Sequence, residues 1–340
     1  MHFKTVHIIP CCMRYGWEEK RALALLLLAC LGLCLLVAAF RGWRMAGKER
    51  EEPQEDATLL VYLHDEGRAV EMGLDEYLYG VVGGEMPASF PLEALKAQAV
   101  AARTYTARRM AALGGSPCGK GGADVCTDST CCQSYKSPAA LEERWGGDAR
   151  RNADKLREAV AETHGIIAVY DGEPIEALYH STAGGRTEDA QNVFSAALPY
   201  LVGVDSPGEQ EAAHYTDLEV FSRAAFAKAI NGAYPKAKLK AKKLESQVEI
   251  QARYESGQVE TLRVGNAKIT GKELRKLLDL KSANFEIAFD GDQVRVTTHG
   301  YGHGVGLSQY GARAMALDGA DYAEILKHYY TGIALEPLRR

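Results

Sequence analysis

One glutamate, Glu85, has the sequence surroundings that best suit acid–base chemistry. It lies in the segment GGEMP, where the glycines would let a substrate approach and the proline would stiffen the turn before a long helix. A general acid that works near neutral pH needs a raised pKa, and an apolar wall of Val81, Val82 and Met86 can raise it. A carboxylate that merely approaches the next helix is the alternative interpretation.

Four cysteines, Cys118, Cys126, Cys131 and Cys132, gather in the segment CGKGGADVCTDSTCCQSY (118–135). Thiolates bind zinc, with each sulfur about 2.3 Å from the ion. Outside the cytoplasm, a disulfide is the other expected state of such thiols. Neighbouring cysteines do not easily both ligate one tetrahedral ion, so the ligand set stays open, as does the choice between zinc and a disulfide. No candidate base lies nearby, so a bound zinc would fix the loop rather than catalyse.

Hydroxyl and imidazole groups follow further along the chain. The segment YHSTAGGRT supplies Tyr179, His180, Ser181 and Thr182 at the end of a strand, with hydroxyls suited to hydrogen bonds with sugars. The pattern is no nucleophile elbow, and no third member of a serine–histidine triad is evident. A hydrolase of that type is therefore not favoured.

A glycine-rich segment near the C-terminus, GYGHGVGLSQYGA (300–312), contains His303, with Gln309 and Tyr310 at the start of an alanine-rich helix. His299 and His303 have the spacing of a helical metal pair, but the glycines between them disfavour a helix. Roles in lining the substrate site or in fixing the loop are favoured over metal binding.

A long helix is predicted over FPLEALKAQAVAARTYTARRMAAL (90–113), with Pro91 in its first turn and Glu93 near its positive end. Lys96 and Arg103 are seven residues apart and therefore share one face of this helix. That face could meet glycan carbonyls or Glu85 itself. A simply solvated basic face is the alternative.

The elements that must position these groups predict an α+β fold of mixed helices and antiparallel strands. Strands are expected at TLLVYL (58–63) and at IIAVY, the second followed by a turn at Asp171-Gly172. Residues 214–292 differ in character, with a lysine-rich helix expected at KAKLKAKKL (236–244) and a hairpin across Ser256-Gly257. They are predicted to form an embedded α/β subdomain.

The N-terminal region contains an uninterrupted apolar run, ALALLLLACLGLCLLVAAF (22–40), which is long enough to span a bilayer. It lacks the polar face of a helix that packs on a soluble core. The basic residues on its two sides balance, so they do not orient it. A lipoprotein box ending at Cys30 and a signal-peptidase site at 37–39 are alternatives to an uncleaved transmembrane helix, which is preferred. A charged, flexible linker (41–57) then leads to a folded domain (58–340).

The overall composition excludes one class of partner. The 340 residues carry a net charge of -5, and 46% are hydrophobic, as in an ordinary globular protein. This mild acidity does not suit a nucleic-acid surface, and the aromatic residues are not interleaved with basic ones. Neither a nucleic-acid partner nor an organic cofactor is expected.

Four segments, in order along the chain, resemble the stage II sporulation protein D family of lytic transglycosylases, and they cover residues 84–106, 123–135, 179–207 and 300–316. The resemblance implies a glycan-binding groove, with Glu85 at the family's catalytic glutamate and with Lys96 and Arg103 in support. It also implies cleavage of the bond between N-acetylmuramic acid and N-acetylglucosamine, in which the muramyl 6-hydroxyl closes a 1,6-anhydro ring. Because the substrate supplies the attacking hydroxyl, one carboxyl group suffices where most glycosidases need two.

The resemblance further implies a location, a metal and partners. A catalytic domain that faces the cell wall puts residues 1–21 in the cytoplasm and the protein in the mother-cell membrane that engulfs the forespore. Some members hold a zinc with cysteine and histidine. Cys126 and Cys132 match that pattern, whereas Cys131 stands where a histidine is expected and Cys118 has no histidine beside it.

The partners implied by the family are an amidase, stage II sporulation protein P, and a membrane protein, stage II sporulation protein M. The family also has more distant amidase-enhancer relatives. The alternative function is therefore a non-catalytic, glycan-binding activator of a cell-wall amidase.

Overall fold

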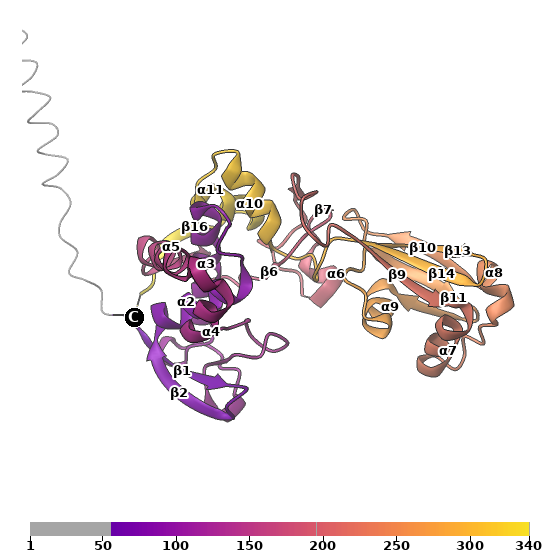
Figure 1. Ribbon diagram of the computed structural model, residues 1–340, viewed down its shortest axis with the longest axis horizontal. Coiled ribbons are helices and arrows are strands. Elements are labelled where there is room, and N and C mark those ends of the chain that lie inside the picture. The colour runs from indigo at the N-terminus through magenta and orange to yellow at the C-terminus, as the bar shows by residue number, and fades with distance from the viewer. Residues whose placement is uncertain (1–55, 195, 340) are drawn as a thin grey trace, which may run out of the picture. The chain divides into compact units, whose positions relative to one another are not determined.

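The computed structural model describes residues 56–194 and 196–339 (Figure 1). The predicted tail, the predicted anchor (22–40) and nearly all of the predicted linker lie outside these residues. Within the described part of the chain, no helix is both long enough and apolar enough to cross a membrane.

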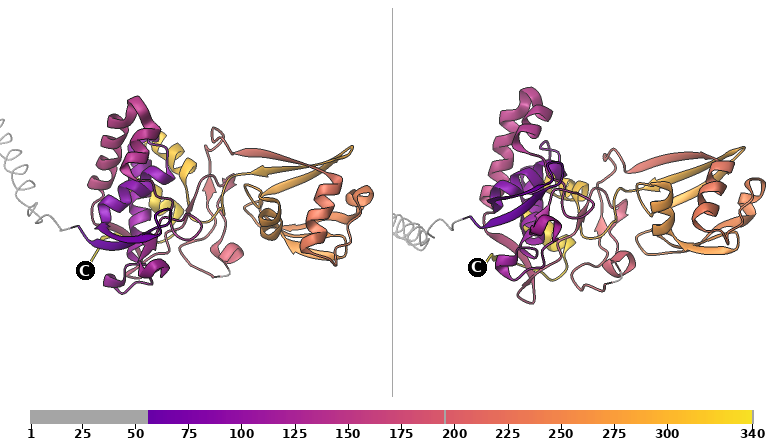
Figure 2. Two further views of the ribbon diagram at one scale, coloured as in Figure 1. Left: turned by 60° about the horizontal axis from the view of Figure 1, so that its bottom comes forward. Right: turned by 90° about the horizontal axis from the view of Figure 1, so that it is seen from below.

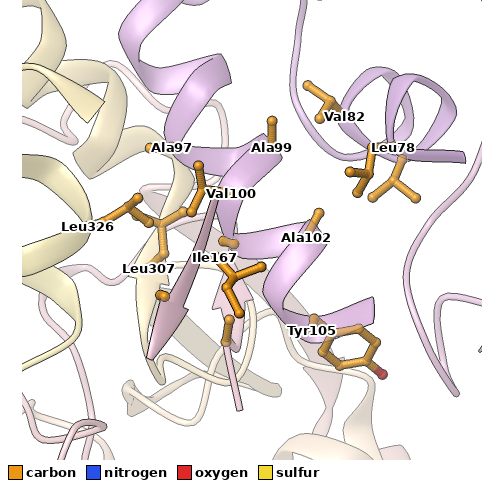
Figure 3. Close-up of a cluster of buried hydrophobic side chains, with 14 of the residues drawn as sticks. Leu78, Val82, Ala97, Ala99, Val100, Ala102, Tyr105, Ile167, Leu307 and Leu326 are labelled. Atoms are coloured by element: carbon orange, nitrogen blue, oxygen red, sulfur yellow. The ribbon is translucent and has the colours of Figure 1, made fainter. Parts of the chain in front are cut away.

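A first hydrophobic core forms around helix α3 (Leu92–Ala107), which contacts α2, α5, β4, α10 and α11. Of its 16 residues, 14 are buried, so α3 is covered on all sides. Figure 3 shows why small residues are needed there, because Ala97, Ala99 and Ala102 lie where neighbouring elements approach the helix. The helices of this part are α2 (Leu74–Glu85), α4 (Pro138–Trp145), α5 (Ala149–Glu162), α6 (Ala190–Phe194), α10 (Gln309–Leu317) and α11 (Tyr322–Tyr329).

Short sheets flank these helices. Strand β1 pairs antiparallel with β2 and parallel with β3, and β4 lies between β16 and β5 in an antiparallel sheet. The expected turn between β4 and β5 is confirmed, with positive φ at both Asp171 and Gly172. The strands are β1 (Thr58–Leu63), β2 (Arg68–Gly73), β3 (Val125–Cys126), β4 (Ile166–Tyr170), β5 (Glu173–Pro174), β6 (Tyr179–His180), β7 (Gly185–Arg186), β8 (Asp205–Ser206), β15 (Leu307–Ser308) and β16 (Ala334–Pro337).

A second core belongs to the embedded subdomain, whose strands and helices are drawn in salmon and orange in Figure 2. Two three-stranded antiparallel sheets, β10-β11-β12 and β13-β14-β9, contribute to it. Strand β14 pairs along its whole length with β9 and β13, so this subdomain extends past the predicted end at 292 to His299. Its elements are β9 (Thr216–Ser222), α7 (Arg223–Ala233), α8 (Leu244–Gln247), β10 (Val248–Arg253), β11 (Val259–Val264), β12 (Ala267–Thr270), α9 (Gly271–Leu278), β13 (Phe285–Asp290) and β14 (Gln293–His299).

Mixed helices and antiparallel strands therefore make up the described fold, as predicted. The prediction of a lysine-rich helix at 236–244 is wrong. That segment contains only a 3₁₀ turn, η4 (Ala241–Lys243), before the short α8. Ala237 and Leu239 are buried in the second core, and their two-residue spacing does not repeat with the period of a helix.

Candidate active site

Glu85 is the last residue of α2, and its carboxylate is held by donors from two separate segments. The backbone N–H of Ser134 donates to Oε1 at 2.7 Å, and Nε2 of Gln309 donates to Oε2 at 3.4 Å. The hydroxyl of Tyr179 lies close enough to lower the pKa of Glu85, but it donates its one proton to Gln133. The helix ends here because Met86 adopts an extended conformation before Pro87.

The glycines near Glu85 allow close packing within the protein and do not open the backbone to a substrate. A Cβ on Gly84 would lie 2.9 Å from the carbonyl oxygen of Ser134, and a Cβ on Gly80 would lie 2.2 Å from the ring of Tyr135. Only glycine lets the segment after the cysteines pack this closely on α2. The expectation that these glycines open the backbone to substrate is thus corrected, because they allow Ser134 to reach the carboxylate.

Burial dominates the acidity of Glu85. The loss of solvent raises the pKa of Glu85 above its ordinary value, and the hydrogen bonds from Ser134 and Gln309, together with the nearby hydroxyl of Tyr179, offset part of this rise. A carboxyl group in such a position keeps its proton to higher pH than an exposed glutamate. It can therefore act as a proton donor closer to neutral pH.

Two glutamines that the sequence analysis missed support the donors. The hydroxyl of Tyr179 donates to Oε1 of Gln133 at 2.8 Å, and Nε2 of Gln133 donates to Thr106 at 3.0 Å. Nε2 of Gln309 is also 3.4 Å from Oε1 of Gln98. Gln98 is fully buried in the alanine-rich α3, and its Nε2 has no acceptor among the described residues. A polar amide inside an otherwise small and apolar helix is the signal that could have identified it.

The predicted imidazoles lie side by side, with the ring centroids of His180 and His303 5.5 Å apart. Nδ1 of His180 lies 3.1 Å from the carbonyl oxygen of Val305, and Nδ1 of His303 accepts from the N–H of Val305 at 3.0 Å. Burial lowers the pKa of His180 to about 3 and that of His303 to about 4. Both rings are therefore neutral near pH 7, which suits neutral hydrogen-bonding roles rather than charge.

The remaining predicted hydroxyl groups lie on the same loops. Ser181 and Thr182 have their side-chain oxygens 3.2 Å apart, and the carbonyl of Ser181 accepts from the N–H of Tyr310 at 3.0 Å. The ring of Tyr310 packs edge-on against Phe90 at 5.0 Å. Strand β6, which carries Tyr179 and His180, pairs with β15 directly before Gln309. This pairing brings the third and fourth predicted segments together beside Glu85.

A buried carboxylate, Glu209, ties these loops in place, and the sequence analysis did not single it out. It accepts from the N–H of Gly184 at 2.8 Å and from the hydroxyl of Ser206 at 2.8 Å, and it also bonds the hydroxyl of Ser308. Its partners lie up to 99 residues away in sequence, so no local pattern could reveal this role.

Lys96 and Arg103 do not join the groups around Glu85. Arg103 is fully buried and donates to Asp75 at 3.0 Å and to the carbonyl of Thr163 at 2.6 Å. Lys96 pairs with Glu93 and Glu162 at 2.7 and 2.5 Å. The expectation that both contact glycan is corrected, because a fully buried guanidinium offers no surface to a polymer and the ammonium of Lys96 already has two carboxylate partners.

The four cysteines form one cluster, and all are free thiols. Their Sγ atoms all lie within 4.8 Å of one another, and those of the neighbours Cys131 and Cys132 are 4.0 Å apart. Four sulfurs around a tetrahedral zinc would be about 3.8 Å apart. The donor set and its spacing therefore fit a zinc ion, and adjacency does not keep Cys131 and Cys132 from facing the same point.

Comparison with known proteins gives consistent matches. The family model for Stage II sporulation protein (SpoIID) matches residues 63–170. Stage II sporulation protein D of Bacillus amyloliquefaciens is 38% identical over 287 residues, which cover 84% of this chain and 81% of that protein. Its counterpart in Bacillus subtilis (strain 168) is 39% identical over 259 residues, with 76% and 73% covered. The Amidase enhancer of the same strain is 28% identical over 311 residues, which cover 76% of this chain and 40% of that protein.

Proposed function

Because the chain belongs to the stage II sporulation protein D family, we propose that it is a lytic transglycosylase that cuts peptidoglycan strands during sporulation. The observation that carries this proposal is a single carboxylic acid, Glu85, with a raised pKa, with donors from Ser134 and Gln309 and with the hydroxyl of Tyr179 nearby. Among the described residues, no second carboxylate hydrogen-bonds to these groups. The proposed reaction uses one carboxyl group, whereas most glycosidases use two.

One carboxyl group can complete the proposed reaction. Protonated Glu85 gives its proton to the glycosidic oxygen as the bond from that oxygen to C1 of the muramyl residue breaks. The 6-hydroxyl of the same residue forms the new bond to C1, and its proton passes to the Glu85 carboxylate. The products are a 1,6-anhydro end and a free 4-hydroxyl, so no water is consumed and the acid is restored.

The test compares Glu85→Gln with Glu76→Gln, which removes an exposed carboxylate from the same helix. We expect the first variant to bind glycan but not cleave it, because the amide keeps the shape and cannot donate an acidic proton. The second should cleave at the wild-type rate, with 1,6-anhydromuramic acid ends by mass spectrometry. Cleavage by Glu85→Gln, or reducing ends in place of anhydro ends, would contradict the proposal.

A non-cleaving activator of a cell-wall amidase is the second candidate, and the resemblance to a protein named Amidase enhancer favours it. An activator needs to bind glycan but has no use for an acid of raised pKa. Wild-type protein that stimulates an amidase equally well with Glu85→Gln, and that releases no anhydro ends alone, would support this candidate over the enzyme.

We further propose that the four cysteines hold a zinc ion, which would supply a rigid cross-link for the loop between β3 and α4. The support is the clustering of four thiols within 4.8 Å. The loop itself is prepared by Asp128, whose carbonyl accepts from the N–H groups of both Cys131 and Cys132 and whose carboxylate pairs with Lys120 at 2.7 Å. The apolar run at 22–40 supports a membrane anchor that presents this domain to the cell wall.

A further inference from the structure

A pocket of about 190 Å³ lies where the embedded subdomain meets the loop that carries His303. Its walls come from the β10–β11 hairpin, from the start of α9 and from the end of α6. The charged residues that line it are Lys272, Arg275 and Glu260. Because His303 is neutral near pH 7, the lining carries one net positive charge.

The guanidinium of Arg275 has unused hydrogen-bond donors and no ion-pair partner among the described residues. Its Nε donates to the carbonyl of Leu280 at 3.2 Å, which closes the end of α9, whereas neither Nη atom has a hydrogen-bond partner among the described residues. Within the same residues, no carboxylate lies at ion-pair distance. The group is half-buried, and its charge helps to lower the pKa of both His303 and His180. The negative charge of Asp279 also acts on Arg275, but from beyond ion-pair distance. A partly desolvated guanidinium with both Nη atoms unpartnered among the described residues favours an anionic ligand.

Lys272 adds a second positive charge to the same pocket. Its ammonium donates to the carbonyl of Val193 and lies 5.9 Å from the ring centroid of Phe194. That ring is 47% exposed and packs edge-on against His303 at 5.4 Å. An exposed aromatic ring beside two cations is a surface on which a sugar can stack while an attached acid reaches the pocket.

The pocket connects with the proposed active site through two neighbouring residues. His303 lines the pocket, and its ring contacts that of His180. His180 follows Tyr179, whose hydroxyl influences the pKa of Glu85. We propose that Arg275 and Lys272 form a carboxylate-binding subsite for an acidic group carried by the peptidoglycan strand. This inference rests on the proposed function, since it takes the glycan as the ligand that lies at Glu85.

Peptidoglycan offers such a carboxylate from two sources. A muramyl residue without peptide ends in a free lactyl carboxylate, whereas a peptide-bearing residue has an amide there and carboxylates further out. Ligand-detected NMR on the purified full-length chain can separate these sources. The probes are N-acetylmuramic acid, its methyl ester, N-acetylmuramyl-L-alanyl-D-isoglutamine and N-acetylglucosamine.

The variants are Arg275→Gln and a matched control, Lys276→Gln, which removes an exposed charge from the same helix. We expect Arg275→Gln to weaken binding of an acid-bearing probe about tenfold or more, as the loss of a charge-assisted hydrogen bond implies. The ester and N-acetylglucosamine should bind weakly to all three proteins. The free muramic acid or the dipeptide, whichever responds to Arg275→Gln, identifies the source.

The subsite is overturned if neither acid-bearing probe binds more tightly than the ester, or if Arg275→Gln leaves the affinity for both acid-bearing probes unchanged. If circular dichroism shows that Arg275→Gln is unfolded, the same binding measurements are made on Lys272→Gln, with the same outcomes expected. The two proposals fail separately. Arg275-dependent binding in a protein that makes no anhydro ends would keep the subsite and refute the enzyme, and anhydro products with no Arg275-dependent binding would do the reverse.

Discussion

Replacement of Arg103 by methionine should destabilise the fold while leaving the chemistry of the folded protein intact. Arg103 is fully buried, and its guanidinium joins four elements of the first core. It donates to Asp75 in α2, to the carbonyls of Val160 and Thr163 at the end of α5, and to the carbonyl of Ile166 in β4. Methionine retains much of the stem but none of these donors.

The expected loss follows from the groups left behind. The carboxylate of Asp75 keeps its contact with His164 at 2.6 Å but loses the guanidinium, and two buried carbonyls lose a donor. Removal of one partner from a buried ion pair costs about 3 to 5 kcal/mol. The two carbonyls add little, because that of Thr163 still accepts from the N–H of Ile166 and that of Val160 from the hydroxyl of Thr163. We therefore expect about 4 kcal/mol, or roughly 10 °C in Tm for a domain of this size.

Thermal unfolding followed by circular dichroism measures the loss, and glycan cleavage at 15 °C, normalised to the folded fraction, measures the chemistry. Arg150→Met is the matched control, because that side chain is 96% exposed on α5 and should change the stability by less than about 0.5 kcal/mol. A wild-type Tm together with lost cleavage in Arg103→Met would refute the reasoning and would support a role for Arg103 in substrate binding.

Three further outcomes are expected. In Gln309→Leu, the ionised form of Glu85 loses a donor, so the pKa of Glu85 should rise further. The pH at which cleavage fails on the alkaline side should therefore increase. An unchanged midpoint would exclude Gln309 as a partner of the acid. Wild-type protein should contain about one zinc per chain by elemental analysis, and Cys126→Ser should lose both the zinc and thermal stability. A metal-free wild-type protein whose mass is lower by two hydrogens would indicate a disulfide instead. His180 and His303 stay neutral in the fold down to about pH 3 and 4, whereas their rings in the unfolded chain take up protons near pH 6.5. The free energy of unfolding should therefore fall as the pH drops from 6.5 to 4. In scanning calorimetry, the stability of His180→Asn should fall less steeply than that of the wild type, and parallel curves would contradict this.

Local sequence was informative where the residues next to a side chain determine its environment. The surroundings of Glu85 predicted a raised pKa, and the structure gives that direction. Tyr179 and Gln309 were selected from separate segments, and the fold brings both to the carboxylate.

Local sequence failed where the role of a residue depends on distant partners. Lys96 and Arg103 share a face of α3, but helical spacing cannot show that the whole helix is buried and that Asp75 and Thr163 meet Arg103 there. The hydrogen bond between Glu209 and Ser308 is equally invisible in a window of a few residues. The lysine-rich segment failed for a further reason, because helix propensity is a weak preference that tertiary packing of Leu239 overrides.

The 224 residues that separate Glu85 from Gln309 have a consequence for the time at which the site forms. A ribosome releases α2 and α3 long before α10 and α11, which cover α3. Contacts between segments so far apart form slowly and require most of the chain. The acid therefore gains its full set of donors only after Gln309 has been synthesised, so a truncated chain that ends before Gln309 carries Glu85 without its complete surroundings.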